Sequence, residues 1–159
     1  MSDKGVLLDT SFFIRLLDPL DPLHLNAKGY YRYFLENDQV MFLSTIAAGE
    51  YCVRGKLDQL PLKQLKILPY NLNHAQKAGE LANTVFANKG KLDLLSRTII
   101  PNDTKLFAQA EVENPICRYL SSDTESAKIY HLLRAKSELN FDFLDLSIPH
   151  HEAFGLLDL

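Results

Sequence analysis

Four acidic residues that lie far apart in the sequence have the type and setting to form one metal site. Asp9 directly follows the apolar run at residues 6–8, and the other three are Glu50, Asp103 and Asp123. Carboxylates held within about 4–6 Å of one another repel and raise each other's pKa, so a cluster of them needs cations. Oxygen ligands without Cys or His suit Mg²⁺ or Mn²⁺. These ions activate water and stabilise charge on a phosphodiester, which is the chemistry we would expect here.

Alternating strands and helices would have to position these acids. Short apolar runs predict strands at residues 6–9, 40–43, 65–68, 116–121 and 141–146. Helical periodicity and end signals predict six helices. They span residues 12–17 (capped by Thr10 or Ser11), 23–36, the segment from the cap Ser44 or Thr45 to Arg54, 73–90 (capped by Asn73 and ended by Gly90), the segment from Pro101-Asn102 to 113, and the segment that follows the strand at 116–121 up to about Ser137. Residues 91–100 and the tail after Ser147 give no clear pattern.

Strands that alternate with helices predict an α/β fold, a three-layer α/β/α sandwich with a mainly parallel central sheet of four to five strands. In such sheets ligands bind beyond the carboxyl ends of the strands. Asp9 and Asp123 follow predicted strands, Glu50 lies about one and a half turns into a helix, and Asp103 is expected in the first turn of its helix. All four acids can therefore meet at one edge of the sheet.

Each acid also has a simpler structural interpretation. An Asp after a strand often only caps a helix, and an Asp in a first turn favours the helix dipole. Taken alone, Asp123 fits the first role and Asp103 the second. Glu50 follows the small, apolar stretch at residues 46–49, and Asp9 ends a buried strand, so both are harder to explain as solvated surface.

The bulk composition sets limits on the class of protein. The 159 residues, 47% hydrophobic and 23% charged, predict a single domain spanning residues 1–159 with its own core. The net charge of −3 argues weakly against nucleic-acid binding, but two bound Mg²⁺ would change it to +1, so RNA is not excluded. Two isolated cysteines, Cys52 and Cys117, predict free, buried thiols. No apolar run approaches the ~18 residues of a membrane span and no signal peptide is recognisable, so a cytoplasmic protein is expected.

The ordered set of acids resembles the PIN-domain family of metal-dependent ribonucleases. The matching segments are Leu8-Asp9-Thr10-Ser11, residues 44–51 with Glu50, residues 102–110 with Asp103, and Ser121-Ser122-Asp123, within a resemblance that covers residues 5 to about 146. No single motif is specific to the family, but the four motifs together, in this order and at about this spacing, are a much stronger indication. The usual Thr before the fourth acid is Ser121 here, which keeps the hydroxyl.

The resemblance implies a fold, an activity and partners. It implies a PIN-like endoribonuclease in which Asp9, Glu50, Asp103 and Asp123 hold one or two Mg²⁺ or Mn²⁺, with Ser11 and Ser121 orienting carboxylates or water. A lone domain of this size is similar to VapC-type toxins of toxin–antitoxin pairs, which implies an antitoxin partner, a homodimer and RNA as substrate. One alternative is a catalytically idle PIN-fold module that binds RNA or a protein. Another is a phosphatase or DNA nuclease with the same metals.

Other candidate sites are weaker. The pair His150-His151 beside Glu152 is the only close histidine cluster, and neighbouring residues on a helix point about 100° apart, which disfavours a shared zinc. The remaining histidines are expected on the surface or at helix caps: His24, His74 and His131. The aromatic segment 30–34 is expected to pack a helix onto the sheet or onto a partner. The candidate phosphate contacts are Arg15, Arg54, Lys56, Arg97 and Lys105.

Overall fold

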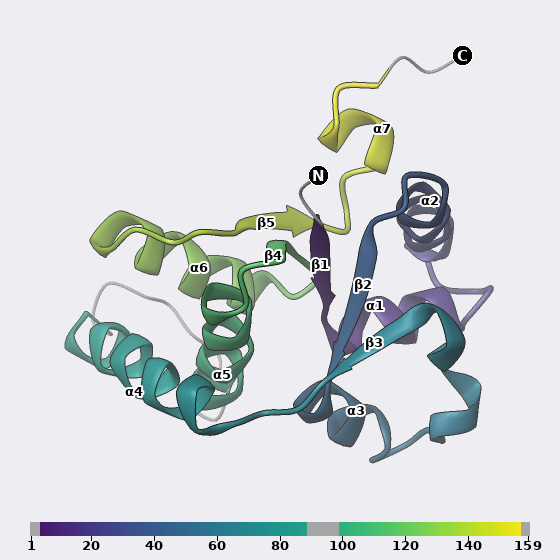
Figure 1. The fold of residues 1–159 in the computed structure, drawn as a ribbon. Helices are drawn as coiled ribbons and strands as arrows, with labels where there is room; N and C mark the ends of the chain where they lie inside the picture. Colours follow the sequence, from purple (N-terminus) through teal and green to yellow (C-terminus); the bar gives the residue numbers. More distant parts are fainter. Residues whose placement is uncertain (1–3, 89–98, 157–159) are drawn as a thin grey trace.

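The computed structural model describes residues 4–88 and 99–156. Its centre is a five-stranded, all-parallel sheet in the order β3-β2-β1-β4-β5, with helices on both faces (Figure 1). The strands are β1 (Gly5–Leu8), β2 (Val40–Ser44), β3 (Leu65–Leu68), β4 (Ile116–Ser121) and β5 (Asp142–Asp145). The predicted α/β sandwich with a parallel central sheet is confirmed.

Seven α-helices and two short 3₁₀ helices connect and cover the strands in the described part of the chain. They are α1 (Thr10–Leu16), α2 (His24–Glu36), α3 (Thr45–Tyr51), η1 (Leu57–Gln59), η2 (Leu62–Gln64), α4 (Leu72–Ala87), α5 (Ile99–Val112), α6 (Thr124–Lys136) and α7 (His150–Ala153). None of the helices in this part of the chain has the length and apolar character that crossing a membrane requires.

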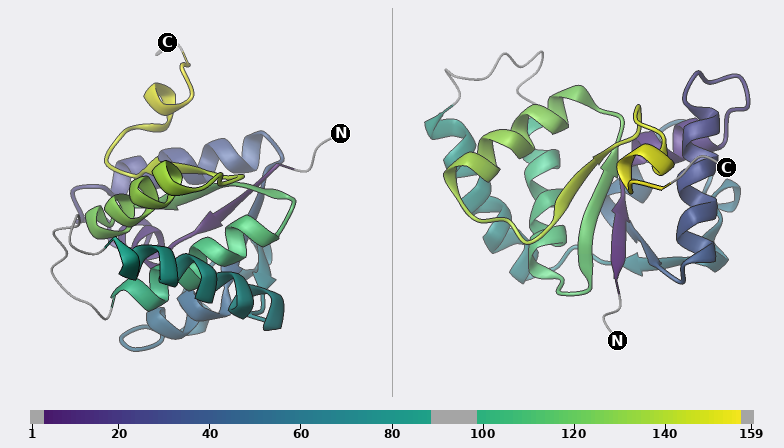
Figure 2. Two further views of the ribbon diagram at one scale, coloured as in Figure 1. Left: turned by 90° about the vertical axis from the view of Figure 1, so that its left-hand side faces the viewer. Right: turned by 90° about the horizontal axis from the view of Figure 1, so that it is seen from above.

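The strand β1 shows how the two cores are divided. Successive side chains of a strand point to opposite faces of the sheet. Leu7 packs into the core beneath α4, α5 and α6, whereas Val6 and Leu8 pack into the core beneath α1, α2 and α3. All three are fully buried, as expected of a strand covered on both faces. Figure 2 shows these two groups of helices on opposite sides of the sheet.

The chain changes direction across the sheet between β1 and β4. It runs outward from β1 through β2 to β3 and then returns to the other side of β1 to form β4. The ends of β1 and β4 are joined by a hydrogen bond from the Asp9 N–H to the Leu120 carbonyl, 3.1 Å. Open parallel sheets bind ligands at such a switch point.

Two helix starts differ from the sequence prediction. Asp9, and not Thr10 or Ser11, caps α1, because its carboxylate accepts the Thr10 N–H at 2.8 Å. Asn71, and not Asn73, caps α4. There the Asn71 side chain accepts the His74 N–H, and the His74 ring accepts the Asn71 N–H in return. The exchange between Asn71 and His74 depends on where the His74 ring lies, which sequence patterns do not reveal.

Three helix limits also differ. The helix α5 begins at Ile99, so Asp103 is its fifth residue and the prediction of a first-turn position was wrong. The helix α3 ends at Tyr51 and continues to Arg54 only as a turn. The helix α4 ends at Ala87, and the predicted stop, Gly90, lies outside the described residues.

The histidine and cysteine predictions are only partly correct. The His74 ring takes part in the capping of α4 by accepting the Asn71 N–H, in line with the predicted capping role, but His74 is fully buried and its Nε2 lies 2.7 Å from Glu113. Cys52 is exposed and Cys117 is partly buried, so the prediction of two buried thiols was wrong, although both are free.

The C-terminal segment packs against α2. The Tyr30 hydroxyl donates to the Ile148 carbonyl at 2.6 Å, and the Tyr33 ring stacks on Phe154 with centroids 4.4 Å apart. Tyr30 and Phe34 are fully buried, which confirms that the aromatic segment packs its helix onto the protein. These contacts place residues 148–154 against α2 although the sequence of this segment has no strong pattern of its own.

Ser44 is expected to contribute to stability as the cap of α3, the helix that carries Glu50. Its buried hydroxyl accepts the Ile46 N–H at 3.0 Å. Ser44→Ala should lower the free energy of unfolding by about 1 kcal/mol, since the loss leaves a helix N–H without a partner. Urea denaturation would measure this. Ser44→Thr keeps a capping hydroxyl and is the matched control, and equal losses in both variants would contradict the capping role.

Candidate metal centre

All four acids singled out from the sequence line one pocket at the carboxyl edge of the sheet. The pocket has a volume of about 370 Å³. Its acidic lining residues are Asp9, Glu50, Asp103 and Asp123. They come from the end of β1, from α3, from α5 and from the start of α6. The structure therefore brings together the residues that the sequence places about 40, 90 and 110 positions apart.

Asp9 is the most completely hydrogen-bonded of the four. Its Oδ2 accepts the hydroxyls of Ser121 at 2.7 Å and Ser11 at 2.9 Å, and its Oδ1 accepts the Thr10 N–H. The two serine oxygens in turn accept backbone N–H groups, from Asp123 to Ser121 and from Ser122 to Ser11, both at 3.0 Å. Burial raises the pKa of Asp9 despite these donors. The serines thus fix the carboxylate and tie the β1 end to the β4 end.

Asp103 is buried with an incomplete set of partners. Its Oδ1 accepts the Ser126 hydroxyl at 2.7 Å. Its Oδ2 is buried and has no hydrogen-bond partner in the described part of the chain. Burial raises the pKa of Asp103 to about 8, and the charges of the other three acids add to the effect. A buried oxygen left this way needs a proton or a cation.

Asp123 caps α6 and still has an oxygen to offer. Its Oδ1 accepts the N–H groups of Glu125 at 2.9 Å and Ser126 at 3.4 Å. The structure thus confirms the helix-cap interpretation of this acid. A capping role through Oδ1 does not exclude a ligand role, because each carboxylate oxygen has two lone pairs and Oδ2 is separate.

Glu50 is the acid that the surrounding protein constrains least. The residue as a whole is exposed, yet its carboxylate lies beside Asp9 and Asp123. Partial burial of the carboxyl group raises its pKa to about 7, and these two charges add to the shift. Glu50 is free to move toward a cation that enters the pocket.

The donor set fits a hard divalent cation that keeps part of its water. Among residues 4–88 and 99–156, no three His, Cys, Asp or Glu side chains already lie close enough to hold one ion. Mg²⁺ sites commonly use only one or two carboxylates, with water and substrate oxygens completing the coordination. Asp103, Asp123 and Glu50 each have a carboxylate oxygen for which no hydrogen bond is seen within the described segments, and these oxygens suit that arrangement. All are oxygen donors, which favours Mg²⁺ or Mn²⁺ over softer metals.

The candidate phosphate contacts differ in whether their side chains are already held by other protein groups. Arg15 is held by Asp21, with Nη1 2.9 Å from Oδ2, and its Nε reaches Ser122 at 3.4 Å. Arg54 is exposed and has no ion pair among the described residues, so it can reach a ligand near Glu50. Lys56 is exposed and Lys105 half-buried. Arg97 lies outside the described residues.

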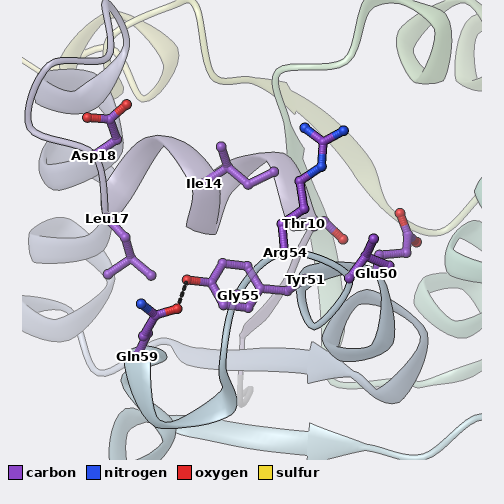
Figure 3. Close-up of a pocket in the computed structure, with 10 residues that line it drawn as sticks. Thr10, Ile14, Leu17, Asp18, Glu50, Tyr51, Arg54, Gly55 and Gln59 are labelled. Carbon is purple, nitrogen blue, oxygen red and sulfur yellow. Dashed lines mark hydrogen bonds between the residues drawn. The ribbon is translucent and has the colours of Figure 1, made fainter.

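A second, larger pocket adjoins the acidic one (Figure 3). It has a volume of about 710 Å³ and shares Thr10, Ile14 and Glu50 with the acidic pocket. The pocket is lined by Ile14 of α1 and by Leu17, the residue that follows this helix. Tyr51 also lines it, and its hydroxyl donates to Gln59. Arg54 and Glu50 extend on the side away from Leu17 and Gln59. An apolar hollow therefore leads directly to the carboxylates.

Two residues near the acids were missed from the sequence. Ser126 contacts Asp103, and the fully buried Tyr119 has a hydroxyl without a hydrogen-bond partner among the described residues. The pKa of Tyr119 is raised well above its ordinary value, first by burial and then by the charges of Asp9, Asp103 and Glu50. A Ser in the first turn of a helix and a Tyr within a strand look ordinary in sequence. Only their position beneath the pocket distinguishes them.

An all-parallel α/β sandwich with four acids at its switch point belongs to the class of folds that place ligands at the strand ends. Neither a family model nor a curated protein sequence matches this chain. The fold is nevertheless shared with solved structures of VapC toxins and their complexes, and it is a VapC-like PIN-domain fold.

Three of these structures illustrate the similarity. VapBC2 from Rickettsia felis, bound to a DNA fragment from its promoter, matches with a TM-score of 0.59 and 16% identity over 89% of this chain and 98% of that chain. VapBC-1 from nontypeable Haemophilus influenzae matches with a TM-score of 0.60 and 15% identity over 91% and 99%. VapC20 from Mycobacterium tuberculosis, a toxin that cleaves the sarcin-ricin loop, matches with a TM-score of 0.53 and 17% identity over 77% and 92%.

Asp103→Asn is expected to stabilise the metal-free protein at alkaline pH. Because the folded-state pKa is raised from 3.8 to about 8, the folded protein keeps a proton that the unfolded chain has released, and stability falls as pH rises through that window. Asparagine keeps an oxygen for Ser126 and has no charge to ionise. We expect a gain of roughly 1–3 kcal/mol at the upper end of the window and almost none at the lower end.

Urea denaturation in EDTA across this pH range would measure the effect. Asp142→Asn removes an exposed acid at the start of β5 and is the matched control. A constant difference between Asp103→Asn and the parent protein at all pH values would show that the Asp103 carboxyl is not perturbed by its surroundings.

Proposed function

We propose that the protein is a metal-dependent endoribonuclease that cleaves RNA phosphodiester bonds, and that it is the toxin of a toxin–antitoxin pair. Asp9, Glu50, Asp103 and Asp123 would hold one or two Mg²⁺ or Mn²⁺. When bound, such ions supply activation of water and stabilisation of charge on the phosphate. The observation that carries the proposal is the convergence of four carboxylates in one pocket, one of them with a buried oxygen that lacks a partner among residues 4–88 and 99–156.

The residues of the chain would each contribute a defined part. Ser11 and Ser121 hold Asp9 in a single orientation through their hydroxyls, so that its position does not depend on the ligand. Glu50 is free to adjust to the substrate or cation. Arg54 is available for an RNA phosphate beside the carboxylates.

The structural neighbours add support of a coarser kind. They include complexes of VapB with VapC and a toxin that cleaves the sarcin-ricin loop. With identities of 15–17%, the likeness concerns the fold. The local geometry around the four acids is what connects that fold to nuclease chemistry in this chain.

Asp9→Asn should abolish most metal-dependent cleavage while leaving the fold intact. Asparagine can still cap α1 by accepting the Thr10 N–H. Its amide cannot reproduce the charge of the carboxylate, and its single oxygen cannot replace both Oδ1, which accepts the Thr10 N–H, and Oδ2, which accepts the two serine hydroxyls. We expect RNA cleavage in Mn²⁺ to fall by about 100-fold or more, since even partners of metal ligands cost 10–100-fold when removed.

Cleavage of labelled total RNA, with and without EDTA, would measure this. Asp142→Asn, at the opposite edge of the sheet, should cleave like the parent protein. Equal cleavage by Asp9→Asn, or by the parent protein in EDTA, would eliminate the mechanism. If calorimetry detects no Mn²⁺ binding at millimolar concentration, the idle binding module becomes the better description.

The adjoining apolar pocket favours a protein partner as part of this function. Its lining includes Ile14, which is 52% exposed, and Val53, which is 79% exposed. Exposed aliphatic side chains around a hollow are a common feature of protein-binding surfaces. An antitoxin segment seated there would reach the carboxylates through the shared residues and block them.

Ile14→Asp and Val53→Asp should therefore weaken antitoxin binding. The probe is the protein encoded by the short reading frame directly upstream, if there is one, co-expressed with each variant. We expect co-purification to be lost in both variants, because a buried charge without a partner costs several kcal/mol. Leu72→Asp is the matched control, since Leu72 is 85% exposed on α4 and lies outside this pocket. Retained co-purification of both pocket variants would place the partner elsewhere.

A further inference from the structure

Asp103 depends on one side chain for its orientation. Its residue is only 6% exposed, and the Ser126 hydroxyl at 2.7 Å is the side chain that donates to it in the described part of the chain. The oxygen that Ser126 does not hold, Oδ2, is the one for which the described residues supply no partner. Removal of the Ser126 hydroxyl would therefore take away the donor that holds Oδ1 of this nearly buried carboxylate.

Ser126 also touches a second acid of the pocket. It is the third residue of α6 and fully buried, and its backbone N–H donates to Oδ1 of Asp123 at 3.4 Å. One residue thus connects an acid of α5 with the acid that caps α6. The two helices pack against each other, so this connection fixes the separation of the two carboxylates.

We propose that Ser126 is a positioning residue of the cation site, which it serves by holding Oδ1 of Asp103 and leaving Oδ2 as the ligand oxygen. The inference rests on the proposed function, because it assigns how one carboxylate of that site is presented. Groups that orient metal ligands commonly change metal affinity by about 10–100-fold when removed. Ser11 and Ser121 do the same for Asp9, so each of the two buried aspartates has its own hydroxyl support.

A purely structural role for Ser126 predicts a different result. If its hydroxyl served only the packing of α5 against α6, its loss would lower stability and leave the affinity for a cation unchanged. A positioning role predicts instead that the loss of the hydroxyl weakens cation binding, and that a higher cation concentration restores it. The two roles therefore separate in a binding measurement.

The test compares Mn²⁺ binding by titration calorimetry in the full-length parent protein, Ser126→Ala and Ser137→Ala. Ser137 lies at the other end of the same helix, where its hydroxyl donates to the Leu133 carbonyl at 3.1 Å. It provides the same substitution without contact to a carboxylate. We expect Ser126→Ala to bind Mn²⁺ about 10-fold or more weakly, and Ser137→Ala to bind like the parent protein.

Cleavage of labelled RNA as a function of Mn²⁺ concentration gives the second readout. For Ser126→Ala the curve should shift to higher Mn²⁺ and approach the parent rate at saturation. If Ser126→Ala does not fold, Ser126→Cys is measured instead, since a thiol has similar size and is a weak donor.

The outcomes separate the inference from the function on which it rests. Absence of Mn²⁺ binding by the parent protein would overturn the proposed function. Parent-like affinity in Ser126→Ala, with Mn²⁺ binding intact in the parent protein, would overturn the positioning role alone. Equal weakening in Ser126→Ala and Ser137→Ala would do so too, because it would trace the effect to the stability of α6.

Discussion

The convergence of four acids in one partly buried pocket is the constraint on which the rest of the structure depends. The parallel sheet delivers Asp9 and Asp123 at a switch point, and helices from both faces add Glu50 and Asp103. Burial and mutual repulsion raise the pKa of Glu50 to about 7 and that of Asp103 to about 8. Burial at this edge disfavours the charged carboxylates, and serine hydroxyls offset part of that cost at Asp9 and Asp103.

The serines show how the fold limits the cost of the cluster. Ser11 and Ser121 each accept a backbone N–H and donate to the same oxygen of Asp9, so both hydroxyls act as relays between the backbone and the carboxylate. Glu50 is exposed and has no comparable hydroxyl donor in the part of the chain that the structure describes. A rigid part and an adaptable part of the pocket therefore face one another, which suits a site that must hold a cation and also admit a substrate.

The sequence predicted the architecture and the meeting of the four acids at one edge of the sheet because both depend on local patterns. The apolar run before Asp9 indicates a buried strand. When strands are parallel, acids that follow them or lie in the next helices meet at one edge of the sheet. Helix starts were less predictable: a cap depends on which side chain reaches the free N–H groups, as in the exchange between Asn71 and His74. Ser126 and Tyr119 were missed because their contacts arise only when α5, α6 and β4 are packed together.

Tyr119 gives the protein an internal optical probe. The chain contains seven tyrosines and no tryptophan, so its ultraviolet emission comes from tyrosine alone. The Tyr119 ring is fully buried and its electrostatic surroundings are set by Asp9, Asp103 and Glu50. A change of charge among these acids alters the field at that phenol. The spectrum of the unmodified protein therefore contains a signal that is sensitive to the charge of the acids in the pocket.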